Sequence, residues 1–462
     1  MRYVSTRGQA PDAGFCDVLL RGLAPDGGLY VPREWPQIQW PISGSYAECA
    51  AAIMQPFIGD EIAEDVFLTL CSEAYSTFRS KEVAPLVRLN PEHYLLELFH
   101  GPTLAFKDIA LQLVGKLFDH VLEQRDERIF LIGATSGDTG SAAIEAVKNC
   151  ANIDIVILYP INRTTEFQRR QMTTVDAPNV HAVAIDGNFD DCQDLVKAMF
   201  NDIAYRDTHK LSAVNSINWA RIMAQTIYYF TASQALHRQV SAGPISFSVP
   251  TGNFGNVLSG WIARRMGAPI RHLIVGSNSN DILTRFFDNR VLAMDQVVRT
   301  LSPSMDIQVP SNFERLLFEM NDRDGMVTAE QLQLFRSAGE MSVEGHQFDE
   351  WITPVFRGHR CDDKATIATM SRIYSETGML VDPHTAVAVA SAESCSESGV
   401  PTVTLATAHP AKFSDSVFSA TGIKPPLPSH LKDMDDRPEH MTRLPNDLSL
   451  VQEFVASCHS ML

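Results

Sequence analysis

The sequence predicts an α/β protein in which parallel sheets carry helices on both faces. Short β-branched apolar runs recur with little polar alternation, which is typical of strands buried on both faces. Helical stretches separate these runs, as the crossover connections of parallel strands require. At 462 residues the chain is too long for one hydrophobic core, so two or three domains are expected.

The first 90 residues are predicted to form an N-terminal domain. They begin with turn-rich sequence over 25–41 and continue into helical patterning over 46–79. An apolar segment at 94–99 follows, and a Gly-Pro turn leads from it into an amphipathic helix that begins near Lys107.

Residues 91–240 are predicted to form a smaller α/β domain that carries Lys107. Apolar runs predict its strands, and helical sequence follows them. The strands are expected at 129–133, 153–159 and 180–185, and helices at about 141–149, 191–200 and 216–236.

Residues 241–462 are predicted to form a large cofactor-binding α/β domain. Its strands are expected at 245–249, 273–275 and 402–406. Between about 285 and 375 the alternation lapses, and charged helical sequence predicts an inserted helical region. An acidic, proline-interrupted tail follows residues 424–428.

Composition and charge restrict the function classes. The chain has 38 Lys plus Arg against 55 Asp plus Glu, and its net charge of −17 argues against a nucleic-acid or anionic-membrane surface. Its eight cysteines show no C-x-x-C pair and no metal-ligand spacing, so reduced thiols are expected. There is no apolar leader and no apolar run of membrane-spanning length. We expect a cytoplasmic protein with no nucleic-acid partner, no membrane attachment and no metal.

Lys107 is the candidate Schiff-base lysine. It lies within residues 100–108 (HGPTLAFKD), directly after Phe106, and an apolar helical stripe over 109–122 follows it. Burial at such a junction disfavours the ammonium and lowers the pKa of a lysine, as Schiff-base chemistry requires. A solvated, purely structural lysine at a helix start is the alternative interpretation.

A glycine-rich loop at 249–256 (VPTGNFGN) joins a predicted strand to a predicted helix. Consecutive backbone N–H groups at a helix N-terminus bind phosphate, and glycines allow the anion to approach closely. The loop is neither a Walker A loop nor a G-x-G-x-x-G motif. A tight turn without a ligand is the alternative.

A second loop, at 133–141 (GATSGDTGS), is rich in hydroxyl groups. It could bind a carboxylate at the start of the following helix. Alternatively it is only a capped helix start, with Thr139 or Ser141 as the N-cap.

Residues 215–221 (NSINWAR) open a long predicted helix, with Ser216 as its N-cap and Arg221 in its first turn. Arg221 could bind phosphate oxygens, although an incidental surface arginine is the alternative. Residues 404–410 end a late strand, where a hydroxyl could face a ligand. A structural role is the more plausible one for His409. Two phosphate-sized sites and a Schiff-base candidate together suggest pyridoxal phosphate acting on an anionic substrate.

Seven motifs extend over nearly the whole chain. They are residues 26–32 (DGGLYVP), 100–108, 133–143 (GATSGDTGSAA), 214–222 (VNSINWARI), 249–256, 301–320 (LSPSMDIQVPSNFERLLFEM) and 406–413 (ATAHPAKF). In this order they resemble the threonine synthases, in the subgroup that lacks an N-terminal S-adenosylmethionine-binding domain. The resemblance implies the α/β architecture of pyridoxal-phosphate enzymes of fold type II, which the tryptophan synthase β chain shares.

The resemblance also implies residue roles. Lys107 would hold pyridoxal phosphate as a Schiff base and act as the catalytic acid and base. Thr407 would face the pyridine nitrogen. The loop around the cofactor phosphate would be Gly252, Asn253, Phe254, Gly255 and Asn256. Substrate contacts would come from Thr135, Ser136, Asp138 and Thr139, and substrate-phosphate contacts from Asn215, Ser216 and Arg221.

The implied activity is that of a carbon–oxygen lyase in the last step of threonine biosynthesis. O-phospho-L-homoserine and water would give L-threonine and phosphate, by γ-elimination of phosphate and β-addition of water. The subgroup resemblance implies a monomer. Among the alternatives, the 215–221 site disfavours a hydroxy-amino-acid dehydratase, intact Lys107 disfavours an inactive cofactor-binding protein, and the missing G-x-G-x-x-G disfavours a Rossmann dehydrogenase. A phospholyase that adds no water remains open.

Overall fold

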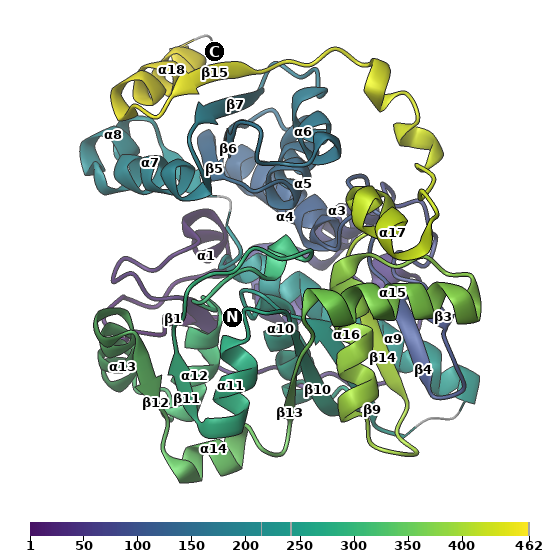
Figure 1. Ribbon diagram of the computed structural model, residues 1–462. Coiled ribbons are helices and arrows are strands. Elements are labelled where there is room, and N and C mark those ends of the chain that lie inside the picture. The colour runs from purple at the N-terminus through teal and green to yellow at the C-terminus, as the bar shows by residue number, and fades with distance from the viewer. Residues whose placement is uncertain (214, 241–242, 461–462) are drawn as a thin grey trace.

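The computed structural model describes residues 1–213, 215–240 and 243–460, and two parallel-rich sheets organise them (Figure 1). In the six-stranded sheet only β3 is antiparallel to its neighbour. Its strands are, in order, β13 (Phe356–Arg360), β10 (Ile270–Ser277), β9 (Ile245–Pro250), β14 (Thr402–Ala406), β4 (His93–Glu97) and β3 (Leu86–Arg88). The prediction of an α/β protein with parallel sheets is confirmed.

The five-stranded sheet is parallel throughout. Its order is β15 (Thr442–Pro445), β7 (Val180–Asp186), β6 (Ile153–Pro160), β5 (Ile129–Ala134) and β8 (Leu211–Ala213). Both faces are buried, since Ile155 and Ile157 join one core cluster while Val156 and Leu158 join another. This is why the strand sequences show so little polar alternation.

Helices cover both faces of each sheet. Helix α16 (Pro383–Cys395) packs on the six-stranded sheet, as does α10 (Gly255–Arg265), which also contacts α9 (Trp219–Val240). Helix α15 (Asp363–Thr377) lies on α16 and contacts α17 (Ser414–Thr421). We call this sheet with its helices the six-stranded lobe.

The five-stranded lobe is built in the same way. One face is covered by α7 (Phe189–Asn201) and α18 (Leu448–Ser460), with α8 (Ile203–Thr208) beside α7. On the other side lie α5 (Asp138–Val147) and α6 (Glu166–Thr173), and α4 (Lys107–Arg125) packs against α5 and α9 and so lies between the lobes. No helix of the described ranges is long and apolar enough to span a bilayer.

The N-terminal region packs against α4 and α9. It contains a two-stranded antiparallel sheet of β1 (Tyr3–Ser5) and β2 (Tyr30–Pro32), together with α1 (Phe15–Arg21). The helical pattern predicted over 46–79 is divided into α2 (Tyr46–Ile58), the 3-10 turn η1 (Gly59–Glu61) and α3 (Glu64–Tyr75). Gly59 divides it, because its φ of +65° ends α2.

The predicted inserted helical region is only partly helical. Within the described residues it contains five helices, of which α15 is the last, and the 3-10 turn η2, but also the hairpin β11–β12 and the edge strand β13. The bounds are α11 (Ile282–Asn289), β11 (Val291–Ala293), η2 (Pro303–Met305), α12 (Phe313–Met320), α13 (Gly325–Ala338), β12 (Glu340–Ser342) and α14 (Gly345–Trp351). The polar sequence of β13 (FRGHR) hid it from hydrophobic patterning, since an edge strand is only half-buried.

The sheets cross the predicted domain boundaries at 90 and 240. Strand β4, which precedes Lys107, pairs with β14 in the six-stranded sheet rather than with the strands at 129–185. The tail supplies β15 and α18 to the five-stranded lobe, after the 3-10 turns η4 (Ser429–Leu431) and η5 (Met434–Asp436). Sequence proximity grouped the apolar segment at 94–99 with the residues up to 240, because an apolar strand can pair in either sheet, whereas no strand was predicted in the tail. Val214 lies outside the described residues, and so do residues 241–242, which follow the boundary predicted at 240.

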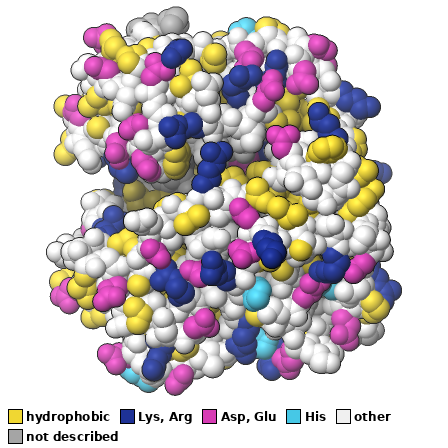
Figure 2. Space-filling view, viewed as in Figure 1, with side chains coloured by type: hydrophobic (Ala, Val, Ile, Leu, Met, Phe, Trp, Pro, Cys, Tyr) yellow, Lys and Arg dark blue, Asp and Glu magenta, His cyan; other side chains and the backbone are white. Residues whose placement is uncertain are grey.

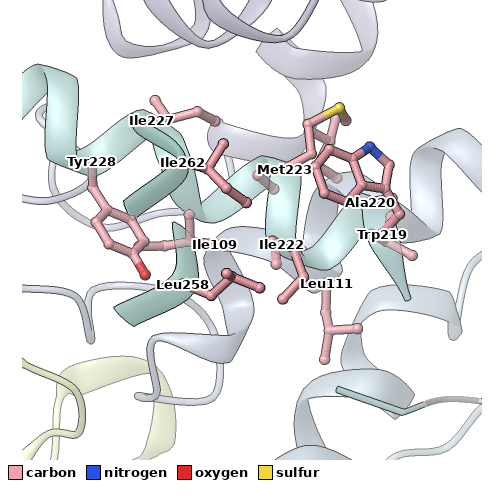
Figure 3. Close-up of a cluster of buried hydrophobic side chains, with 14 of the residues drawn as sticks. Ile109, Leu111, Trp219, Ala220, Ile222, Met223, Ile227, Tyr228, Leu258 and Ile262 are labelled. Carbon is pink, nitrogen blue, oxygen red and sulfur yellow. The ribbon is translucent and has the colours of Figure 1, made fainter. Parts of the chain in front are cut away.

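A continuous apolar core holds α4 in place (Figure 3). Side chains of α4, α9 and α10 meet there, all of them fully or almost fully buried. They include Ile109 and Leu111 of α4, Trp219, Ile222, Met223 and Ile227 of α9, and Leu258 and Ile262 of α10. The first turn of α4, with Lys107, is therefore anchored in the interior of the molecule.

Candidate active site

Lys107 is largely buried at the start of α4. Its side chain is 11% exposed, and its Nζ lies 3.5 Å from Oδ2 of Asp138 and 5.2 Å from the ring centroid of Phe106. Burial lowers the pKa of Lys107, Asp138 opposes that shift, and the nearby charges of Lys412 and Arg221 add to it. The structure thus agrees with the sequence-based expectation of a buried lysine whose pKa is depressed.

The backbone before Lys107 pairs with the segment that follows β14. Ala105 and Ala408 form an antiparallel bridge, and the N–H of Phe106 donates to the carbonyl of Thr407 at 2.9 Å. Thr407 therefore lies beside Lys107 where the parallel strands β4 and β14 end. Leu104 is buried with φ +64°, a rare conformation for this residue, and packs with Leu431 and Met434 of the tail.

The hydroxyl-rich loop begins its helix earlier than predicted. Helix α5 starts at Asp138 rather than near 141, and neither Thr139 nor Ser141 is its N-cap. Instead Oγ1 of Thr135 accepts the N–H groups of Gly137 at 3.0 Å and Gly140 at 2.9 Å. Gly137, at φ +142°, permits this tight turn, which sequence patterning had not identified.

Asp138 faces the two buried lysines. Its Oδ1 lies 3.0 Å from Nζ of Lys412 and accepts Nε2 of Gln168 at 2.9 Å. Burial raises the pKa of Asp138, but Lys412 and Lys107 together hold it far below the usual range. Of the other predicted loop residues, Thr135 is buried, Thr139 is half-buried and Ser136 is exposed.

The glycine-rich loop leads from β9 into α10. Phe254 precedes the helix at φ +61°, and the first-turn N–H groups of α10 have no carbonyl within the helix to bind. Oδ1 of Asn256 accepts the hydroxyls of Tyr228 at 2.6 Å and Tyr229 at 2.9 Å. Its Nδ2 is buried and has no hydrogen-bond partner among the described residues. Such an orphaned donor fits an anion or another acceptor at the loop.

Close packing against neighbouring segments of the chain also requires glycine in this loop. A Cβ on Gly252 would lie 2.5 Å from the carbonyl oxygen of Ser304, and one on Gly255 would lie 3.2 Å from Nδ2 of Asn312. Glycine at 252 therefore allows close approach of another backbone segment, independently of any phosphate.

Residues 215–218 form a turn that precedes α9. The helix begins at Trp219, so the prediction of Ser216 as its N-cap is wrong. Asn218 binds the helix start instead, because its Oδ1 accepts the N–H of Ala220 at 3.0 Å. Oδ1 of Asn215 accepts the N–H of Ile217 at 3.2 Å, which stabilises the turn.

Arg221 lies in the first turn of α9 and is buried, being 5% exposed. Its Nε and Nη1 are buried and have no hydrogen-bond partner within the described part of the chain. Burial lowers its pKa to about 10, and no neighbouring acid opposes the shift. The alternative of a surface arginine is wrong. A buried cation with unused donors is unfavourable by itself and fits an anionic ligand.

Two further residues connect the glycine-rich loop with the turn before α9, and the sequence motifs assigned them no role. The Nδ2 of Asn312 donates to the carbonyls of Asn253 at 3.1 Å and Ser216 at 3.2 Å. Arg315, fully buried, donates to Oδ1 of Asn312 at 2.5 Å and to the carbonyl of Ile217 at 2.7 Å. Both belong to the 301–320 motif, and the length of that motif is the one sequence feature that could have indicated a role for them.

The surface is hollowed between the two lobes, on the left of the view in Figure 2. A cavity of about 630 Å³ is lined mainly by the segments that follow β6 and β7, including the exposed Arg163, and on its other side by the exposed Arg299 before η2. In the interior, the cations Lys107, Lys412 and Arg221 outnumber the buried carboxylates of Asp138 and Asp108. This excess of positive charge fits a phosphorylated cofactor and an anionic substrate.

Comparison with known proteins agrees with this arrangement. Family models match residues 2–75 (threonine synthase N terminus), 78–348 (pyridoxal-phosphate dependent enzyme) and 385–455 (threonine synthase, C-terminal). The chain is 51% identical to the threonine synthase of Pseudomonas aeruginosa, covering 99% of this chain and 98% of the relative.

Two solved structures are similar over almost the whole chain. The pyridoxal-phosphate-bound threonine synthase of Brucella melitensis has a TM-score of 0.96 at 48% identity, with 99% of each chain covered. The yeast threonine synthase has a TM-score of 0.95 at 36% identity, covering 100% of this chain and 99% of the other.

Proposed function

The chain belongs to the threonine synthase family, and from this premise we propose which of its residues carry the reaction. It is a pyridoxal-phosphate-dependent enzyme that converts O-phospho-L-homoserine and water to L-threonine and phosphate. The observation that carries the residue assignment is a buried lysine of lowered pKa near a buried arginine with unused donors.

Lys107 is the residue that holds the cofactor covalently, through Nζ. The N–H groups of the loop from Gly252 to Asn256, together with Nδ2 of Asn256, bind the cofactor phosphate. Thr407 supplies a neutral hydroxyl at the pyridine nitrogen, and a hydroxyl has no charge with which to keep that nitrogen protonated. When bound, pyridoxal phosphate draws electron density from the carbons of the attached amino acid.

Lys107 also moves the protons. Its amine would take the proton of Cα and give it up to the bound cofactor, so that it is neutral again when it takes a proton from Cβ. It would then return that proton at Cγ after phosphate has left. A single amine that acts repeatedly as base and acid needs a pKa near neutrality. Burial and the charges of Lys412 and Arg221 lower the pKa in that direction, while Asp138 keeps the ammonium form accessible.

The substrate is held at two ends. Arg221 binds the leaving phosphate with Nε and Nη1, and Asn215 and Ser216 line the same turn. At the other end, N–H groups and hydroxyls of the loop that carries Thr135, Ser136 and Thr139 bind the carboxylate. Asp138, in the same loop, faces Lys107 rather than the carboxylate, because two anions would repel one another.

The lobes provide the setting for this chemistry. The five-stranded lobe acts as the smaller domain and closes on the six-stranded lobe to exclude water from the reacting carbons. The protein acts as a cytoplasmic monomer; all eight cysteines are free thiols, which accords with a reducing compartment.

The test is product analysis after the purified protein is incubated with pyridoxal phosphate and O-phospho-L-homoserine. L-Threonine with stoichiometric phosphate is the expected result. Release of 2-oxobutyrate and phosphate would instead identify a phospholyase that adds no water. Equal rates with unphosphorylated L-homoserine would remove the role given to Arg221.

A further inference from the structure

Lys412 is a second buried lysine beside Lys107, and the chemistry above gives it no direct contact with substrate. Its side chain is 0% exposed. Its Nζ lies 2.8 Å from the carbonyl oxygen of Thr103, 3.0 Å from Oε1 of Gln171 and 3.0 Å from Oδ1 of Asp138. An ammonium has three protons, so each acceptor takes one. Lys412 is thus a saturated cation rather than a free nucleophile.

The two oxygens of Asp138 are divided between the two lysines. Oδ1 faces Lys412 at 3.0 Å, while Oδ2 faces Lys107 at 3.5 Å. Lys412 lies in η3 (Pro410–Phe413), a few residues after Thr407, whereas Asp138 begins α5 in the five-stranded lobe. A cation anchored beside β14 therefore holds a carboxylate that belongs to the other lobe.

We propose that Lys412 is a positioning residue, whose buried ammonium engages one oxygen of Asp138 and so limits how strongly the other oxygen stabilises the ammonium form of Lys107. This inference rests on the proposed function, since it takes Lys107 as the reacting amine. Lys412 has two effects on that amine, and both favour its neutral form: it shares the carboxylate that stabilises the ammonium form, and it brings a like charge close to Lys107. If the charge of Lys412 is removed, Asp138 attracts only Lys107, and the ammonium form of Lys107 becomes more stable.

The other ionisable groups near these lysines come from α4, α9 and the segment after β14. Arg221 of α9 also lowers the pKa of Lys107. Asp108 of α4 is engaged by Thr103, whose N–H and Oγ1 donate to it at 2.8 and 2.7 Å, and burial raises its pKa to about 6. Burial lowers the pKa of His409 to about 4. None of these groups is altered in the variants below.

The test compares Lys412→Met with Gln171→Met in the full chain, freed of cofactor. Gln171→Met removes a neutral partner of the same Nζ but keeps its charge, so it is the matched control. Acetic anhydride acetylates only unprotonated amines, and peptide mass spectrometry gives the rate at Lys107 against pH, with the exposed Lys116 in the same digest as reference. Lys412→Met should raise the midpoint for Lys107 by about one pH unit, and Gln171→Met should leave it unchanged.

An unchanged midpoint in Lys412→Met, or equal shifts in both variants, would overturn the proposal. If Lys412→Met does not fold, Asp138→Asn and the double variant Asp138→Asn/Lys412→Met replace it, because the double variant leaves no buried carboxylate without its partner. The added Lys412→Met must then raise the midpoint above that of Asp138→Asn; identical midpoints refute the role.

Borohydride reduction of the wild-type holoenzyme, followed by peptide mapping, tests the underlying assignment separately. A label on Lys107 supports the proposed function whatever the midpoints are, and a label elsewhere defeats that function without reference to Lys412.

Discussion

Arg221→Met is expected to weaken turnover while leaving the folded protein as stable as the wild type or more stable. Burial lowers the pKa of the guanidinium from 12.5 to about 10, and at 1.36 kcal/mol for each pKa unit this corresponds to about 3 kcal/mol by which the buried charge disfavours folding. Methionine keeps an apolar chain of similar reach in the same core and removes that charge. The stability of the unliganded protein should therefore rise by up to about 3 kcal/mol.

The same substitution removes the cation that faces the substrate phosphate. Loss of one partner of a buried charge pair costs about 2–5 kcal/mol, so kcat/KM with O-phospho-L-homoserine should fall by roughly 30-fold to several thousand-fold. Binding of L-threonine to the holoenzyme, followed by the visible absorbance of the cofactor, should change far less, because threonine has no phosphate.

Urea unfolding and steady-state kinetics on the two proteins provide the measurements. Inorganic phosphate should compete with substrate and raise the unfolding midpoint of wild-type holoenzyme, but not of the variant. The reasoning is refuted if Arg221→Met loses about 2 kcal/mol of stability or more, which would show that the guanidinium has a compensating partner. Equal losses with both ligands would refute it as well.

Three further outcomes are expected. Lys107→Ala should abolish the borohydride-reducible link to cofactor and lower turnover by at least about 10⁴-fold, and a link mapped to another lysine would contradict this. Gly255→Val should lose cofactor on dialysis more readily than wild type, as cofactor absorbance will show, whereas Gly252→Val should also unfold more easily, because its Cβ overlaps the carbonyl of Ser304. Burial lowers the pKa of His93 to about 4, below the 6.5 of the unfolded chain, so its contribution to stability is complete above pH 6.5 and is lost as pH falls towards 4. Between pH 7 and 5 the free energy of unfolding should drop by about 2 kcal/mol less in His93→Gln than in wild type, and equal drops would contradict the shift.

The strands that could be predicted are those buried on both faces. Runs such as 129–133 and 153–159 are almost entirely apolar, because helices cover both sides of the sheet, and the structure places β5 and β6 there. Strand β13 escaped prediction because its edge position requires little apolar surface. The tail strand β15 escaped because its four residues alternate between exposed and half-buried positions.

The site residues were predictable as motifs but not as an arrangement. Lys107, the glycine loop and the turn before α9 all stand out locally by residue type and spacing. The burial of Arg221 and the saturation of Lys412 depend on segments hundreds of positions apart, such as the contact of Lys412 with Thr103. The same applies to Asn312, whose bonds to two loops exist only after three distant segments have come together. Patterning along one segment contains no information on such contacts.

The strand order of the two sheets has a consequence for synthesis on the ribosome. The parallel neighbour of β4, near residue 95, is β14, which lies about 300 positions later in the chain. The outer neighbour of β7 is β15, which comes later still. Until residues 402–406 have emerged for β4, and residues 442–445 for β7, each of these strands presents an unsatisfied edge to other nascent chains. The contact order is correspondingly high, and slow folding with dependence on chaperones is the expected result. A chain truncated near residue 400 would lack β14, β15 and Thr407, so neither sheet would be complete and Lys107 would have no Thr407 beside it.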